Sequence, residues 1–217
     1  MNTPLEVLTP TEAAVVSGVS VRDVNRIIDE SILPEGFYSS SVHRVRSFKS
    51  NACVFISFYF ESAGRLTSEE RQRTIATASH HFLNWTAKQD WSIQDEFLTI
   101  DLFPFWTRVH DRLLRLSAAR DLVIVDEEIL SGTPIIKGTR IPVYDVAASV
   151  AAGVPMRRIL SAYPGLNEEM VELAALYAEA NPQRGRPRRS PAIPAGAVVI
   201  SSRRSPRRDL PHEATPR

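Results

Sequence analysis

The fold of the first part of the chain is decided by residues 9–30, which read TPTEAAVVSGVSVRDVNRIIDE. Thr9 is a typical N-cap, and Pro10 suits the first position of a helix, where the amide hydrogen is not needed. Gly18 ends this helix and Ser20 is the N-cap of a second one. Two short helices around a glycine turn predict a helix-turn-helix.

The second helix, expected from residue 21 to about residue 30, has two different sides. Its apolar residues recur at helical spacing and predict a buried face; they are Val21, Val24, Ile27 and Ile28. Arg22, Asn25 and Arg26 fall on the opposite side, together with Asp29. Arginine reads guanine and asparagine reads adenine in the major groove, so with Ser20 these three are candidate DNA-binding residues. The alternative is the solvated side of an ordinary surface helix.

Four segments follow from helix signals, turn residues and composition along the chain. Residues 1–48 form the helix-turn-helix unit, in which residues 43–48 are a short strand or wing. Residues 49–120 are a mixed middle region, and residues 121–181 are a small β element followed by three helices. Residues 182–217 are a basic tail. The predicted fold class is therefore mainly α with small β elements.

The middle region is less clearly patterned than its neighbours. Residues 52–60 are apolar and aromatic, which predicts burial but leaves helix and strand both open. Helices are expected at residues 67–85, with Thr67 as N-cap, and at residues 104–119. Residues 96–102 are a strand candidate. Cys53 lies in the apolar stretch, which favours a buried, inert thiol.

The third segment alternates short apolar pieces with turns. A strand is expected at residues 122–125, and the β element around Gly138 follows it. Helices are expected at residues 144–152, 156–162 and 168–180, the last with Asn167 as N-cap. The last helix is acidic, so contact with protein, such as dimerisation, is preferred over contact with DNA phosphates.

Charge is distributed unevenly along the chain. The net charge is only +1, but residues 182–217 hold nine arginines against two acids, which leaves residues 1–181 at −6. An acidic body with a basic, proline-rich tail is typical of an interaction protein. The tail cannot bury enough apolar surface to offset its conformational entropy, so it is predicted to be disordered when alone.

Composition limits the compartment and the class of protein. A hydrophobic content of 43% is ordinary for a chain with a buried core. Its single cysteine cannot form an internal disulfide, no signal peptide is apparent, and no apolar run is long enough to span a membrane. These observations predict a cytoplasmic protein without a membrane partner.

A resemblance appears at residues 132–143, which read GTPIIKGTRIPV, and continues through spaced motifs up to residue 178. This pattern resembles a small "domain of unknown function" family of VapB-type antitoxins, whose partners are PIN-domain-like ribonuclease toxins of the VapC type. The resemblance implies a trihelical, DNA-binding-like unit, a toxin partner and a homodimer. Lys137 and Arg140 lie within the motif and are candidates for contact with DNA phosphate or with a partner's carboxylate. The alternative is a structural turn with exposed basic side chains.

The resemblance also gives the tail a role. The implied toxin holds Mg²⁺ with carboxylates, and an arginine can pair bidentately with such groups. An apolar island in the tail can add a strand to a sheet edge or fill a groove. The candidate toxin-binding residues are Arg184, Arg186, Arg188, Arg189, Val198, Val199, Ile200, Arg203 and Arg204. The alternative is a tail that coats DNA without sequence preference.

These observations favour an antitoxin of a type II toxin-antitoxin pair that also represses its own promoter. The alternative is a DNA-binding transcription regulator without a toxin. Enzymes are disfavoured because no common catalytic motif occurs, so no catalytic residue, metal site or cofactor is expected. A nuclease cluster can be imagined from Asp90, Asp95, Glu96 and Asp101, but nothing in their spacing requires one.

Overall fold

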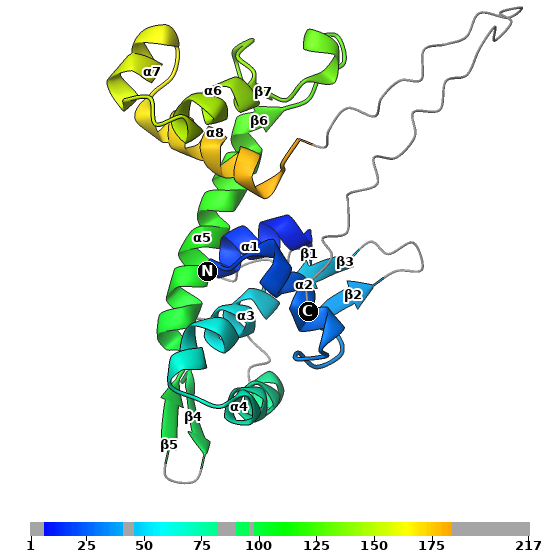
Figure 1. Ribbon diagram of the computed structural model, residues 1–217. Coiled ribbons are helices and arrows are strands. Elements are labelled where there is room, and N and C mark those ends of the chain that lie inside the picture. Colours follow the sequence, from blue (N-terminus) through cyan, green and yellow to red (C-terminus); the bar gives the residue numbers. More distant parts are fainter. Residues whose placement is uncertain (1–6, 41–45, 82–89, 96–97, 184–217) are drawn as a thin grey trace, which may run out of the picture. The chain divides into compact units, whose positions relative to one another are not determined.

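A computed structural model describes residues 7–40, 46–81, 90–95 and 98–183 (Figure 1). The chain divides into two units, Met1–Gln183 and Arg184–Arg217, and all of the described residues belong to the first. The boundaries predicted after residues 48 and 120 both lie inside that first unit. The disorder predicted for the tail concerns residues that, from 184 onward, lie outside the described part.

The N-terminal elements form a helix-turn-helix backed by a small antiparallel sheet. They are β1 (Val7–Leu8), α1 (Pro10–Ser17), α2 (Val21–Asp29), β2 (Tyr38–Ser40) and β3 (Arg46–Lys49). The strand order is β1-β3-β2, with Phe48 of β3 opposite both Leu8 and Tyr38. Both predicted helices are confirmed. The strand predicted at 43–48 is present from Arg46, and its first three positions lie outside the described residues.

The middle elements comprise two helices, a hairpin and one long helix. They are α3 (Ala52–Glu61), a 3₁₀ turn (Ser62–Gly64), α4 (Ser68–His81), β4 (Ser92–Asp95), β5 (Leu98–Asp101) and α5 (Phe103–Leu122). The stretch that left helix and strand open is therefore a helix. It is buried on nearly every side, which removes the periodicity that would have identified it. The predicted strand at 96–102 corresponds to β5, whose antiparallel partner β4 was not anticipated.

The C-terminal elements follow the predicted order closely. They are β6 (Val123–Ile124), a 3₁₀ turn (Leu130–Gly132), β7 (Ile135–Ile136), α6 (Val143–Ala151), α7 (Met156–Ala162) and α8 (Glu168–Ala180). β6 and β7 pair antiparallel, and Ile135 also bridges to Pro142. The strand predicted at 122–125 begins one residue later, because Leu122 is the last residue of α5.

Two clusters of buried side chains hold these elements together. The first extends from Leu8 to Leu116 and includes Ala180, so the helix-turn-helix and the middle region share one core. Cys53 is fully buried in this cluster, as predicted, and desolvation raises the pKa of its thiol to about 12. The second cluster lies under α6, α7 and α8, around Ile136 and Val171. Among the helices that the structure describes, none is both long and apolar enough to cross a membrane.

Candidate nucleic-acid interface

Local sequence signals determine where the two helices of the helix-turn-helix begin and where α1 ends. The Thr9 hydroxyl accepts a hydrogen bond from the Glu12 amide, and the Glu12 carboxylate accepts one from the Thr9 amide at 2.9 Å, which completes a capping box. Gly18 ends α1 with φ +71°, a left-handed conformation that glycine adopts without strain. Ser20 begins α2 by accepting a hydrogen bond from the Asp23 amide. Ser20 therefore has a capping role independent of any DNA contact.

Two arginines of α5 hold α1 near its two ends. Arg112 donates to the Val16 carbonyl at 3.4 Å, near the C-terminal end of α1. Arg120 donates to the Glu12 carboxylate at 2.8 Å, in the first turn of α1. The Glu12 side chain is only 7% exposed, so this is a largely desolvated ion pair. Neither contact was predictable from the sequence, because each joins residues about a hundred positions apart.

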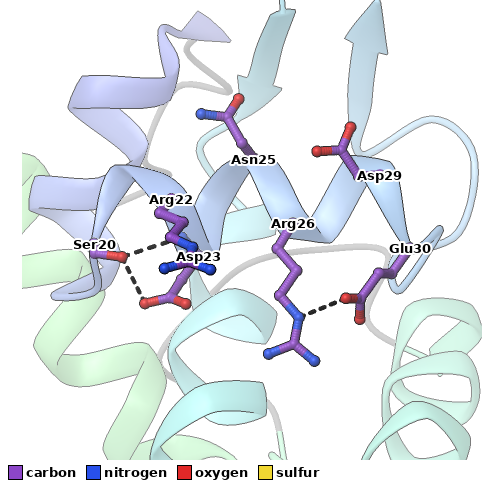
Figure 2. A pocket seen from close by; sticks show the side chains of 7 residues that line it. All are labelled: Ser20, Arg22, Asp23, Asn25, Arg26, Asp29 and Glu30. Carbon is purple, nitrogen blue, oxygen red and sulfur yellow. Dashed lines mark hydrogen bonds and ion pairs between the residues drawn. The ribbon is translucent and has the colours of Figure 1, made fainter. Parts of the chain in front are cut away.

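The outward residues of α2 divide into two rows rather than one (Figure 2). Arg22, Arg26 and Glu30 follow one another at four-residue spacing, and Asn25 and Asp29 form the second row. Arg26 donates to Glu30 at 2.7 Å in an exposed pair, and this hydrogen bond raises the pKa of Arg26. Arg22 is exposed, and within the described residues no hydrogen bond or ion pair holds its guanidinium.

The second row is tied to the adjacent hairpin by Arg46 of β3. Arg46 donates to the Asn25 side-chain oxygen at 2.9 Å and to the Asp29 carboxylate at 2.6 Å. The Asn25 amide nitrogen meanwhile donates to the Val21 carbonyl, one turn earlier in the same helix. Both ends of the Asn25 amide therefore have partners within the protein. An adenine contact by Asn25 would have to compete with them.

The charges around this face of α2 are balanced. An open hollow is lined by Ser20, Arg22, Asp23, Asn25, Arg26, Asp29 and Glu30 (Figure 2). Two of these residues are arginines and three are carboxylates, and Arg46 adds a third cation at the edge. Such a surface supplies hydrogen-bond donors for base edges but little excess positive charge for phosphates. Its chemistry fits readout by a few side chains better than nonspecific attraction to DNA.

The chain resembles another protein along nearly all of its length. It is 52% identical over 210 residues to "Uncharacterized protein y4eO" of Sinorhizobium fredii, and the match covers 94% of each protein. The chain belongs to the family of y4eO. Residues 123–178 also match the family model DUF433, "Protein of unknown function (DUF433)". No solved structure matches the chain.

The y4eO match covers 94% of the chain, whereas the DUF433 match begins at β6 and ends in α8. Lys137 and Arg140 lie within the DUF433 segment, in the turn that follows β7, and both are exposed. Gly138 between them has φ +77°, so a left-handed glycine forms this turn, as expected for a structural role. Lys137 and Arg140 lie in the part of the chain that packs around the second core cluster, whereas α2 packs on the first cluster. The structure therefore does not gather these two cations and the outward residues of α2 into one patch.

The unit formed by α6, α7 and α8 carries mainly acids on its last helix. Arg115 of α5 pairs with Glu172 of α8 at 2.8 Å, so one of these acids contributes to packing within the chain. Tyr144 of α6 donates to the carbonyl of Asn181, which follows α8. These contacts join α8 to α5 and the end of α8 to α6. The preference for a protein-contact role of α8 stays a prediction.

The imagined nuclease cluster finds no support among its described members. The Asp90 carboxylate accepts a hydrogen bond from the Ser92 amide, which lowers the pKa of Asp90. Asp101 likewise accepts from the Phe103 amide at the start of α5. Both carboxylates thus have local structural roles. The side chains of Asp95 and Glu96, and the predicted toxin-binding residues from Arg184 to Arg204, lie outside the described part of the chain.

Proposed function

We propose that this protein is a DNA-binding antitoxin that recognises its own promoter through α2 and neutralises a PIN-domain-like ribonuclease through its basic tail. The observation that carries the DNA-binding half is a capped helix-turn-helix whose second helix presents the exposed Arg22 beside Arg26. A recognition helix in the major groove uses residues near its N-terminal end, and Arg22 is the second residue of α2. Both activities belong in the cytoplasm.

Rigid positioning of α2 also supports this half of the proposal. Base readout requires side chains held within a fraction of an ångström of their targets. The turn glycine, the capping box and the two arginines of α5 hold α1, and α2 packs on α1 through Val24 and Ile27, which are fully buried. Arg46 in turn joins α2 to the β2–β3 hairpin.

Replacing Arg22 with alanine should weaken binding to the DNA upstream of the protein's own coding sequence by roughly 1–3 kcal/mol, if Arg22 reads a guanine. A gel shift or fluorescence anisotropy titration, repeated with a scrambled duplex, measures this difference. Arg115→Ala is the matched control, since it removes an exposed arginine from α5. An equal loss for both variants, or no loss for Arg22→Ala, would refute the role of Arg22.

Alanine variants of Asn25 and Arg26 can be compared with Arg22→Ala in their effects on DNA binding and on stability. Arg26→Ala should also weaken specific binding, because the Glu30 pair is exposed and a stronger partner can replace it. Asn25→Ala removes a partner of Arg46, so its effect on DNA should be accompanied by a measurable loss of stability. Thermal unfolding of each variant separates the two causes.

The antitoxin half rests on the sequence. The motif at residues 132–143, which resembles VapB-type antitoxins, lies inside the DUF433 match. The nine arginines of residues 182–217 supply the bidentate donors that a carboxylate-lined Mg²⁺ site would bind. The apolar island at residues 197–200 adds a segment suited to a groove or sheet edge of the toxin.

Deleting residues 182–217 should abolish neutralisation of the toxin and leave specific promoter binding largely intact. The test is co-expression with the product of the neighbouring gene, followed by pull-down and a ribonuclease assay. A second variant changes the tail arginines to lysine, which keeps the positive charge but loses the two parallel N–H donors of the guanidinium. This variant should also inhibit the toxin poorly. Full inhibition by the truncated chain would contradict the tail mechanism. Failure of the neighbouring product to bind would favour the alternative of a regulator without a toxin.

A further inference from the structure

Arg46 of β3 uses only part of its hydrogen-bonding capacity within the protein. A guanidinium carries one N–H on Nε and two on each terminal nitrogen. Nη1 of Arg46 donates to the side-chain oxygen of Asn25 at 2.9 Å, and it also lies 3.4 Å from the Asn25 carbonyl and 3.5 Å from one Asp29 oxygen. Nη2 donates to the other Asp29 oxygen at 2.6 Å. Asp29 therefore occupies the edge of the guanidinium between Nη1 and Nη2.

The neighbouring edge of the same guanidinium has no partner among the described residues. Each hydrogen bond that Arg46 makes with them starts at Nη1 or Nη2, and none starts at Nε. In arginine the Nε hydrogen and the second Nη2 hydrogen point the same way, so they form a pair of parallel donors. The Arg46 side chain is 30% exposed. The protein thus holds this arginine by one edge and leaves a bidentate donor on another.

Arg46 meets α2 at one border of the helix's outward face. Val24 and Ile27 are fully buried, and Arg22 stands on the side of α2 opposite to them. Asn25, which binds Arg46, is half-buried and lies between these two sides (Figure 2). Since Arg46 belongs to β3, its side chain reaches this border from outside the helix.

The width of the major groove decides what a side chain in this place contacts. The groove is about 12 Å wide and an α-helix with its side chains is about 10–12 Å across, so a recognition helix fills the groove. A side chain that approaches the border of that helix from a neighbouring strand therefore meets the sugar–phosphate backbone that flanks the groove. Arginine binds a phosphate through two parallel N–H donors.

We propose that the Nε–Nη2 edge of Arg46 binds one backbone phosphate of the promoter DNA that α2 reads. This contact deepens the proposed function and rests on it, because it requires α2 in the major groove. Phosphate contacts carry no sequence information, but they fix the position of a recognition helix along the duplex. Arg46 thus sets the register in which Arg22 and Arg26 meet the base edges.

The balanced charge around α2 favours a directed contact of this kind. The hollow beside α2 has three carboxylates and only two arginines, and Asp29 also pairs with Arg46. Little excess positive charge is therefore present to attract phosphates, so a phosphate has to be bound through well-placed hydrogen bonds. Holding the guanidinium in place beforehand reduces the side-chain entropy that is lost when DNA binds.

Arg46→Lys tests the contact, because lysine keeps the positive charge and lacks the paired donors. Fluorescence anisotropy with the purified full-length chain should show binding about 10-fold weaker, as for the loss of one charge-assisted hydrogen bond. The loss should be similar for the promoter duplex and for a scrambled duplex, because both offer the same phosphates. Arg22→Ala should instead weaken mainly promoter binding, because it removes a base contact.

Arg115→Lys is the matched control for this variant. Arg115 is an exposed arginine that also pairs with a carboxylate, and it lies on α5 rather than beside α2. This control should bind both duplexes as the wild-type protein does. Thermal unfolding of each variant establishes that the proteins compared are folded.

Duplexes with a single neutral linkage locate the phosphate. Methylphosphonate replaces one phosphate per duplex at successive positions along both strands of the bound promoter site. At one position, binding of the wild-type protein should fall by about 10-fold, whereas binding of Arg46→Lys should change little, because the same contact cannot be lost twice.

The outcomes separate this inference from the proposed function. If the wild-type protein does not distinguish the promoter from the scrambled duplex, both fall together. If it does, and Arg46→Lys binds both duplexes like the wild type or weakens promoter binding alone, only the phosphate contact is wrong. A wild-type protein that no methylphosphonate weakens, or an Arg46→Lys protein weakened equally at every position, would also overturn it.

Discussion

Replacing Arg120 with alanine should lower the free energy of unfolding by roughly 3 kcal/mol, the lower end of the range for breaking a buried ion pair. Glu12 is 7% exposed and would keep only its hydrogen bonds from Thr9. Its carboxylate would then be buried without a cation, and that desolvated charge is the main cost. The lower end applies because the Arg120 side chain is itself 30% exposed. Urea denaturation measures the change.

Arg115 of the same helix provides the control for this variant. Its pair with Glu172 leaves both side chains more than half exposed, so Arg115→Ala should cost at most about 1 kcal/mol. Glu12→Gln introduced into the Arg120→Ala protein should recover part of the loss, because it removes the uncompensated charge. Equal costs for Arg115→Ala and Arg120→Ala would show that burial of Glu12 does not determine the energy of this contact.

Replacing Gly18 with alanine should cost about 2–3 kcal/mol, because two penalties add. The first is roughly 1–2 kcal/mol for a left-handed conformation in a residue with a Cβ. The second arises because that Cβ would lie 2.8 Å from Cζ of Arg112, so the guanidinium must move and give up its bond to the Val16 carbonyl. Thermal or urea unfolding detects the loss, and promoter binding should fall in parallel.

Gly153 separates the two penalties. It has φ +69°, close to the +71° of Gly18, but nothing within 4 Å of a Cβ placed there. Gly153→Ala should therefore cost only the conformational part. In an Arg112→Ala background, the cost of Gly18→Ala should fall to the same value. If the two glycines cost the same in the otherwise wild-type protein, Arg112 does not constrain the turn.

The ends of the helices were predictable wherever the stop and start signals are local. Thr9 and Pro10 begin α1, Ser20 begins α2 and Asn167 begins α8, each at the predicted residue. A cap acts through neighbours only two or three positions away, so its effect is visible in the sequence. Residues 52–60 could not be assigned for the opposite reason, since α3 is buried on nearly every side and the periodicity of its apolar residues is lost.

The candidate site was predictable in composition and not in geometry. Arg22, Asn25 and Arg26 stand on the outward side of α2, as their spacing indicates. Nothing in the local sequence shows that Arg46 binds Asn25 and Asp29. The contact depends on the register of β3 against β1 and β2, which pairs residues remote in the chain.

The sequence by itself determined where α1, α2 and α8 begin, the charge difference between residues 1–181 and 182–217, and the residues that α2 turns outward. The helix starts and the outward side of α2 depend on neighbours within a turn or two, and the charges are read directly from the residues. Only the tertiary structure decided that Arg112 and Arg120 hold α1 and that Arg46 binds Asn25. The physical reason is that burial and pairing are properties of segments brought together by packing, and a linear pattern records which residues are able to pair but not which of them meet.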